Sequence, residues 1–211
     1  MDDRRGVRET YDRIAEHFSE TRHHPWPDVE AFCAGRRASV AVDVGCGNGR
    51  HTALLVDRAD RAVGVDASPT LLSIAAEAVP GAAFLAGDAA RLPLAADVAD
   101  LGIYVATLHH LPDRTLRRRS LDELARILDA EGVAIVSVWS TVHERFDDVD
   151  GDDDVGVDRT IDWTLPDGET VPRYYHIYSP TEFERDLADS ALEAVSTWLT
   201  SGNCYAIVTP A

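Results

Sequence analysis

The sequence predicts an α/β fold in which helices cover both faces of a mostly parallel β-sheet. Short apolar runs alternate with segments of helical periodicity along most of the 211 residues, which is typical of βαβ units. A glycine-rich loop at residues 43–50 follows the first apolar run. The last two runs, residues 192–199 and 204–208, are joined by a short polar turn, which predicts an antiparallel terminal strand. We expect seven strands in one domain, residues 1–211.

The N-terminal part precedes this alternation and is predicted to be helical. Residues 7–20 place apolar side chains at helical spacing, and the prolines Pro25 and Pro27 then interrupt the chain before a short helix that ends near residue 34. We therefore treat residues 5–34 as an N-terminal helical segment.

Strands and helices are then expected to alternate in order. The expected strands are residues 39–44, 61–65, 82–86, 98–105 and 132–138, and the expected helices are residues 49–58, 68–79, 113–128 and 181–190. Ser68 and Pro69 suit the cap and the first position of a helix. Residues 143–172 are rich in Asp and Gly, so we expect a mobile acidic insertion and no metal site.

Charge is the unusual feature of the composition. Asp and Glu total 37 against 20 basic residues, all of them arginine, which gives a net charge of −17. The regular apolar segments argue against a disordered acidic chain and favour a folded, halophilic protein of a high-salt cytoplasm. At molar salt the Debye length is about 3 Å, so this charge does not exclude an RNA substrate.

Other features of the composition predict a cytoplasmic protein with free thiols. No apolar run is long enough to span a membrane, and no signal peptide is apparent. The three cysteines are widely spaced, so we expect neither a disulfide nor a metal site from them.

The loop at residues 43–50 (DVGCGNGR) places glycines at alternate positions, Gly45, Gly47 and Gly49. Glycine lets the backbone turn tightly and approach a ligand closely. Sites for a dinucleotide pyrophosphate use the spacing G-x-G-x-x-G instead. The spacing here, with Asp43 in front of it, suits the ammonium-bearing amino-acid group of S-adenosylmethionine (SAM).

Acidic residues also end the next two predicted strands. Asp66 is placed to bind both ribose hydroxyls, and Asp88 to accept from the adenine amino group with the backbone of Ala89 as a donor. Each acid alone could simply cap a helix or turn, but together with the loop they predict SAM as the cofactor. The expected cofactor-binding residues are Asp43, Gly45, Cys46, Gly47, Asn48, Gly49, Asp66, Ala67, Asp88 and Ala89.

Several segments resemble one family of class I SAM-dependent methyltransferases. Residues 11–22 (YDRIAEHFSETR) and 25–27 (PWP) are similar to the start of the tRNA wobble-uridine carboxymethyl methyltransferases. Residues 106–111 (ATLHHL), 138–139 (VW) and 173–178 (RYYHIY) are similar to the same family, and only the acidic insertion falls outside the resemblance. It implies methylation of the carboxylate of 5-carboxymethyluridine at the tRNA wobble position. It also implies a heterodimer with a small zinc-binding activator protein, in which this chain is the catalytic subunit.

The residues in these segments suit that chemistry. A carboxylate is already ionised at neutral pH, so its methylation needs orientation more than a strong base. Guanidinium groups match a carboxylate, and aromatic rings could stack on the uracil. Because Tyr174 and Tyr175 alternate faces, at most one should face the site; of His109 and His110 we favour His109. Arg22 could instead pair with a nearby acid, and Trp26 could pack on the core. The expected catalytic residues are His109, His110, Arg22, Arg173, Tyr174 and Tyr175, and the expected substrate-binding residues are Trp26, Arg22, Arg173 and His176.

The partner prediction also has a physical basis. In this sheet layout the third strand, residues 82–86 (AAFLA), lies at an edge and carries neither charge nor proline. Such an edge invites strand addition by a partner, although a loop of the same chain could cover it.

Two alternatives share much of this evidence. A small-molecule methyltransferase acting on a quinone or another metabolite would have the same fold and SAM site, but residues 18–22 and 173–178 count against it. A SAM-binding subunit without catalytic activity is the other alternative, and it would not need the histidines at 109 and 110.

Overall fold

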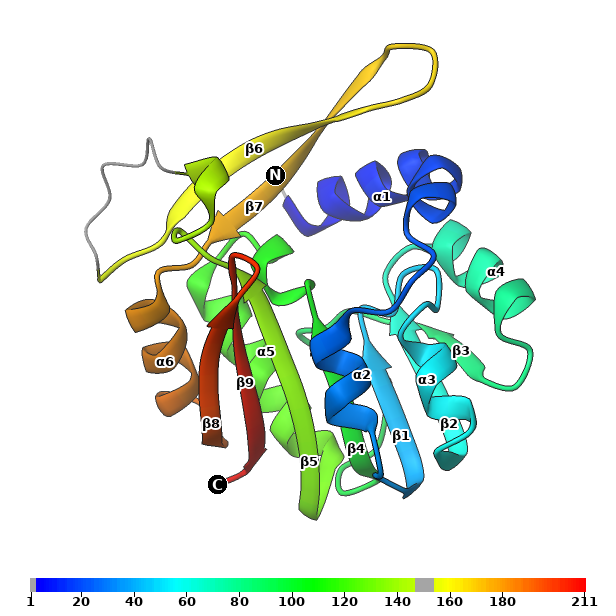
Figure 1. Ribbon diagram of the computed structural model, residues 1–211, viewed down its shortest axis with the longest axis vertical. Helices are drawn as coiled ribbons and strands as arrows, with labels where there is room; N and C mark the ends of the chain where they lie inside the picture. The colour runs from blue at the N-terminus through cyan, green and yellow to red at the C-terminus, as the bar shows by residue number, and fades with distance from the viewer. Residues whose placement is uncertain (1–2, 147–153) are drawn as a thin grey trace.

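The computed structural model describes residues 3–146 and 154–211, and its centre is a seven-stranded sheet (Figure 1). The strand order is β3-β2-β1-β4-β5-β9-β8. Neighbours from β3 to β5 are parallel, and β9 runs antiparallel to both β5 and β8, as the sequence predicts. The strands are β1 (Ala38–Val44), β2 (Ala59–Asp66), β3 (Ala83–Ala86), β4 (Ala99–Val105), β5 (Leu128–Trp139), β8 (Leu192–Thr200) and β9 (Asn203–Pro210).

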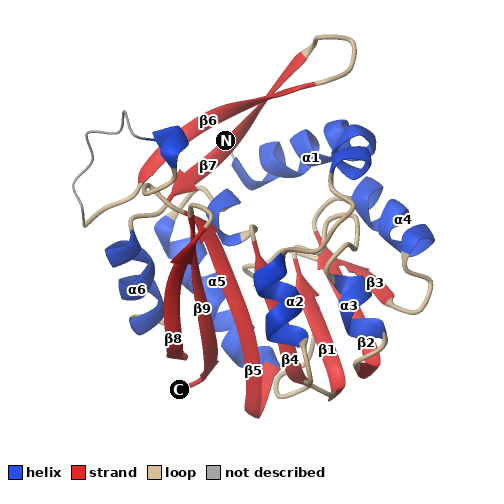
Figure 2. Cartoon of the chain, in the orientation of Figure 1, coloured by secondary structure: helices blue, strands red, loops and turns tan. Residues whose placement is uncertain are grey.

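Helices cover both faces of this sheet (Figure 2). Side chains of α5 and α6 enter one apolar core, and side chains of α2 and α3 enter the other. Ser68 caps α4 by accepting from the backbone N–H of Leu71, and Asp113 caps α5 in the same way. The helices are α1 (Asp3–Thr21), α2 (Pro27–Cys33), α3 (Thr52–Val56), α4 (Pro69–Ala78), α5 (Arg114–Ile127) and α6 (Pro180–Ala188), with short 3₁₀ turns η1 (Leu108–His110) and η2 (Glu144–Phe146).

The acidic insertion differs from its prediction. A β-hairpin of β6 (Val157–Thr164) and β7 (Thr170–Ile177) occupies much of the segment expected to be mobile. Ile161 and Trp163 alternate with exposed polar residues along β6, the pattern of a strand with one buried face. Because the segment is rich in acidic residues, this alternation of buried and exposed positions is difficult to recognise in the sequence. Residues 147–153, to which the expectation also applied, lie outside the described residues.

The hairpin and α1 form a roof above the carboxyl ends of the strands (Figure 1). Ile14 of α1 packs with Trp163 and Val171 of the hairpin in one apolar cluster. The indole Nε1 of Trp163 donates to Nδ1 of His17 at 3.0 Å, and Arg13 forms an ion pair with Glu169. Two segments far apart in the sequence therefore build one layer.

Two further expectations concern membranes and thiols. Across the described ranges, no helix combines the length and the apolar character needed to cross a bilayer. The three cysteines are free, as the sequence predicts, and all three are buried.

Candidate active site

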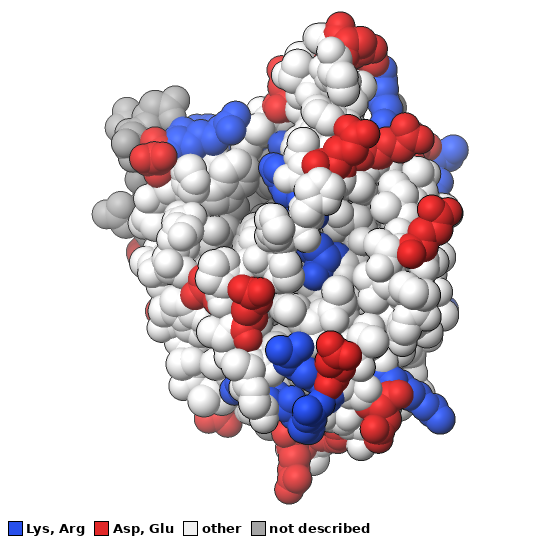
Figure 3. Space-filling model, turned by 45° about the vertical axis from the view of Figure 1, so that its right-hand side comes forward, with Lys and Arg blue, Asp and Glu red and all other residues white. Residues whose placement is uncertain are grey.

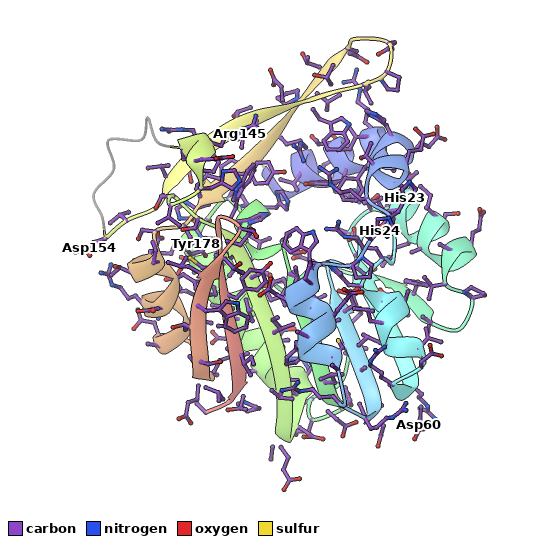
Figure 4. All side chains as sticks on the ribbon, viewed as in Figure 1. His23, His24, Asp60, Arg145, Asp154 and Tyr178 are labelled. Carbon is purple, nitrogen blue, oxygen red and sulfur yellow. The ribbon has the colours of Figure 1, made fainter. Side chains whose placement is uncertain are left out.

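A cavity of about 1060 Å³ lies between the roof and the carboxyl ends of β1 to β5. Its walls include Val44, Asp66, Val105 and Trp139, each at or near the end of a different strand. Figure 4 shows the side chains that surround it; the labelled His23 and His24 belong to the connection between α1 and α2 and do not line the cavity. Ligands of doubly wound sheets bind at this end of the strands.

The glycine loop begins with a turn that only glycine fits. Gly45 has φ of +71°, and its N–H donates to the carbonyl of Val65 at 2.7 Å. A Cβ built on Gly45 would lie 2.1 Å from Oγ1 of Thr107. Gly47 has φ of +54°, and a Cβ there would meet nothing closer than a Phe18 ring atom at 3.7 Å. At Gly45 and Gly47 the loop therefore faces the cavity with backbone atoms that carry no side chain of their own.

Asp43, which the sequence predicts to bind the cofactor, lies behind this loop and does not line the cavity. Its side chain is 2% exposed, and its Oδ2 accepts from Oγ1 of Thr52 at 2.7 Å. The carboxylate thus ties β1 to the start of α3. Gly49 also lies away from the cavity, because it packs closely against Ala75 and Val79 of the α4 region.

The environment of Asp43 predicts a pH-dependent stability. Burial raises the pKa of Asp43 to about 7, although the hydrogen bond from Thr52 opposes that shift. The folded state therefore binds a proton that the unfolded state, with a pKa of about 3.9, has released. This contribution to stability is complete below about pH 4 and is lost as the pH rises to about 7.

We expect the wild type to lose on the order of 4 kcal/mol of unfolding free energy across that window relative to Asp43→Asn. Asparagine keeps an acceptor for Thr52 but does not titrate. Urea unfolding of both proteins at a series of pH values measures this difference. A difference that stays constant from pH 4 to 8 would contradict it.

Asp66 and Asp88 do line the cavity. Oδ2 of Asp66 accepts from the N–H of Gly47 at 2.9 Å, and Oδ1 accepts from the N–H of Ser68 at 2.8 Å, so this carboxylate joins the loop to the end of β2. Burial raises the pKa of Asp66, and these N–H groups partly offset the shift. Oδ1 of Asp88 accepts from the N–H of Ala90 at 2.9 Å.

These groups fit SAM. Carboxylate oxygens can accept from ribose hydroxyls and from an adenine amino group, since each carries more than one lone pair. The backbone at Gly47 leaves room for close approach. Of the remaining residues expected at the cofactor, Gly45, Cys46, Asn48, Ala67 and Ala89 all line the cavity.

The acceptor residues divide into two groups. Arg22, Trp26, Arg173, Tyr175 and both histidines line the cavity, and Tyr174 and His176 do not. The hydroxyl of Tyr174 instead donates to Asp158 at 2.7 Å. His176 lies between Asp158, 2.8 Å from Nδ1, and Glu182, 3.0 Å from Nε2. His176 thus links the hairpin to α6, and it lies outside the cavity lining although the sequence predicts substrate binding there. Of Tyr174 and Tyr175, at most one of which is expected to face the site, Tyr175 lines the cavity and Tyr174 does not.

The tautomers of the two histidines follow from their partners. Nδ1 of His110 lies 3.1 Å from the carbonyl oxygen of Tyr174, which can only accept, so Nδ1 carries the hydrogen. Nε2 of His110 then accepts from the hydroxyl of Tyr11 at 2.9 Å. Nδ1 of His109 accepts from the N–H of Trp139 at 2.9 Å. Burial lowers the pKa of His110 to about 4 and that of His109 well below its usual range, so both rings are neutral.

Sequence reasoning missed several residues of the cavity. Tyr11 and Trp139 line it, but on the printed sequence they look like core residues of a helix and a strand. Burial raises the pKa of Tyr11 well above 10, against the effect of the nearby Arg173. Arginines that looked scattered in the sequence also converge on the cavity, and Figure 3 shows basic side chains near the middle of one face. The lining arginines are Arg5, Arg8, Arg22, Arg50, Arg145 and Arg173, against the two acids Asp66 and Asp88.

Comparisons with known proteins match this chain to methyltransferases. Residues 42–136 match a family model described as a methyltransferase domain. A protein of Encephalitozoon cuniculi designated a methyltransferase is 30% identical over 218 residues, 99% of each chain. A tRNA (carboxymethyluridine(34)-5-O)-methyltransferase of Arabidopsis thaliana is 36% identical over 139 residues, 65% of this chain and 33% of the relative.

Six curated relatives with that tRNA methyltransferase name are 31–38% identical, and the chain spans only 20–59% of their length. Among solved structures, the complex between the Haloferax volcanii Trm112 methyltransferase activator and a methyltransferase matches with a TM-score of 0.70 and 20% identity, over 97% of each chain. The full-length relative, the family model and the shared fold lead to one conclusion: the chain belongs to the class I SAM-dependent methyltransferases.

Proposed function

We propose that this chain methylates the carboxylate of 5-carboxymethyluridine at the tRNA wobble position, in the cytoplasm, as the catalytic subunit of a heterodimer. The observation that carries the proposal is the excess of arginine around the cavity of a chain whose net charge is −17. An arginine-lined cavity concentrates an anionic ligand that the rest of the surface repels. The names of the curated relatives supply the identity of the nucleoside.

Arg173 is the residue best placed to hold the acceptor carboxylate. Its guanidinium carbon lies 4.7 Å from the ring centre of Trp163 and 5.1 Å from that of Tyr175. Its buried Nε has no hydrogen-bond partner among the described residues. An unpaired buried donor is costly, and a substrate carboxylate would satisfy it.

The chain itself has little proton chemistry to perform. SAM, when bound, supplies an electrophilic methyl group. An ionised carboxylate attacks without losing a proton, so the residues need to orient it and exclude water. Neutral His109 and His110, fixed by backbone partners, form a wall that does not compete with Arg173 for the acid.

This chemistry predicts a flat pH dependence. With saturating substrates, we expect kcat to change less than about twofold between about pH 6 and 8.5, because neither His110 nor the acceptor acid titrates there. Initial rates measured in parallel with circular dichroism separate this result from the effect of Asp43 on folding. A rate that rises with a neutral pKa would instead indicate a general base, as an acceptor hydroxyl would require.

The direct test of the function uses methyl-labelled SAM and tRNA that carries the free acid. We expect the label in tRNA, and mild alkali should release all of it as methanol because only an ester is labile. Alkali-stable label in tRNA would contradict a carboxylate acceptor. Label in solvent-extractable metabolites would indicate the small-molecule methyltransferase, and SAM binding without any transfer would indicate the non-catalytic subunit.

We also propose that the partner is a small zinc-binding activator that docks on β3. This strand is one of the two edge strands of the sheet, with β8 at the other edge. Most of its residues are exposed, and Leu85 is 36% exposed. The named partner of the similar solved methyltransferase is an activator of that kind of enzyme. A purified single chain that is monomeric and as active as the co-expressed pair would contradict the proposal.

A further inference from the structure

One indole ring lies behind two of the cavity's arginines. The guanidinium carbon of Arg22 is 5.3 Å from the ring centre of Trp163, and that of Arg173 is 4.7 Å from the same ring. Arg22 follows the end of α1, Arg173 belongs to β7 and Trp163 to β6. Three separate elements thus meet at this ring.

Neither guanidinium group forms a salt bridge with an acidic side chain in the part of the chain that the structure describes. Both line the cavity, whereas Trp163 does not. Both guanidinium groups therefore lie against the same ring. Their positive charges are available to bind an anionic ligand in the cavity. Since both carbons are measured from one ring centre, their separation cannot exceed the sum of the two distances, so both cations belong to one part of the cavity lining.

Trp163 is itself held firmly. Its side chain is buried, with 8% exposed, and it packs with Ile14 and Val171. Its Nε1 donates to Nδ1 of His17 at 3.0 Å. These contacts fix the plane of the ring, and stacking on a fixed plane restricts where each guanidinium can lie.

We propose that Trp163 is a positioning residue that sets Arg22 and Arg173 as one clamp for the acceptor carboxylate, and that this clamp selects a carboxylate over the neutral carboxamide. The inference rests on the proposed function and deepens it. Guanidinium groups only donate hydrogen bonds, so a carboxamide would direct its own N–H donors at one of them. A site built for one hydrogen-bonding pattern rejects the wrong one strongly.

The test compares the binding of two anticodon stem-loop RNAs that differ only at the wobble uridine, with a carboxymethyl group or its carbamoylmethyl amide. Dissociation constants are measured in the presence of S-adenosylhomocysteine. We expect the wild type to prefer the acid by about 100-fold or more. Trp163→Leu should reduce that preference to less than about tenfold by removing the ring face, and Trp163→Phe should keep most of it.

Controls separate positioning from folding. Trp198 stacks on Tyr205 and does not line the cavity, so Trp198→Leu removes a comparable indole and should leave the acid preference unchanged. Arg22→Lys keeps the charge but loses the planar stacked group, and it should reduce the preference even if Trp163→Leu does not fold.

The outcomes distinguish the clamp from the function. A wild type that binds acid and amide equally would overturn the proposed acceptor, and the clamp with it. A wild type that prefers the acid, with Trp163→Leu and Arg22→Lys preferring it equally, would overturn the clamp alone. A preference lost in both variants and kept in Trp163→Phe and Trp198→Leu supports it.

Discussion

Arg173→Ala is expected to lower kcat/KM for the acid-bearing tRNA about 1000-fold, or about 4 kcal/mol of transition-state stabilisation. The guanidinium has an unpartnered buried Nε and stacks on Trp163 and Tyr175, so its loss would leave the substrate anion without its partner in a shielded cavity. Steady-state rates of ester formation measure the effect. Affinity for SAM, measured by calorimetry, should change less than about threefold, because the donor groups lie on other loops.

Two variants control this prediction. Arg118→Ala removes an exposed arginine that pairs with Asp189 at 3.7 Å, and it should leave both constants near the wild-type values. Arg173→Lys keeps the charge without the planar fork and should fall between the wild type and alanine. An Arg173→Ala enzyme with normal kcat/KM, or one that loses SAM affinity in equal measure, would contradict the assigned role.

Gly45→Ala is expected to weaken SAM binding about 100-fold and to lower the unfolding free energy by about 3 kcal/mol. Alanine is strained at φ +71°, and its Cβ would also lie 2.1 Å from Oγ1 of Thr107. The loop can relieve that contact only by moving, which displaces the backbone that faces the cofactor. Calorimetry for SAM and urea unfolding measure the two effects.

Gly35 offers a matched control, because it has φ of +73° but nothing within 4 Å of a built Cβ. Gly35→Ala should therefore show the backbone strain alone, about 1 kcal/mol, with unchanged SAM affinity. If Gly45→Ala behaved like Gly35→Ala, the close contact with Thr107 would not be what requires glycine there.

The sheet could be predicted from the sequence because its signals are local. Apolar runs, the glycine loop and caps such as Ser68 and Asp113 each specify structure within a few residues, and the strands and helices lie where these signals predict them. The hairpin at residues 157–177 could not be predicted in the same way. The apolar face of the hairpin packs against Ile14, more than a hundred positions earlier in the chain. Neighbouring residues in the sequence therefore do not indicate what buries that face.

The site shows the same limit. Asp66 and Asp88 follow strand ends, and strand direction alone brings them to the cavity. Asp43 is one residue before the end of β1, whereas Asp66 is the last residue of β2. Asp43 therefore lies further from the carboxyl end of the sheet, where its side chain contacts Thr52 of α3 and does not reach the cavity. Tyr174 and His176 both contact Asp158 on the other strand of the hairpin, and the sequence alone does not reveal that partner.

The roof has a consequence for how acceptor range can change in evolution. The residues that fit the methyl donor lie at or after the ends of β1, β2 and β3, whereas the residues proposed for the acceptor, and Trp163 behind them, come from the end of α1 and from the hairpin. From the proposed acceptor role, we expect exchange of the hairpin between relatives to alter which molecule is methylated while the donor loops stay intact. We therefore infer that the hairpin, the segment whose composition says least about its fold, is where new acceptor specificity can arise.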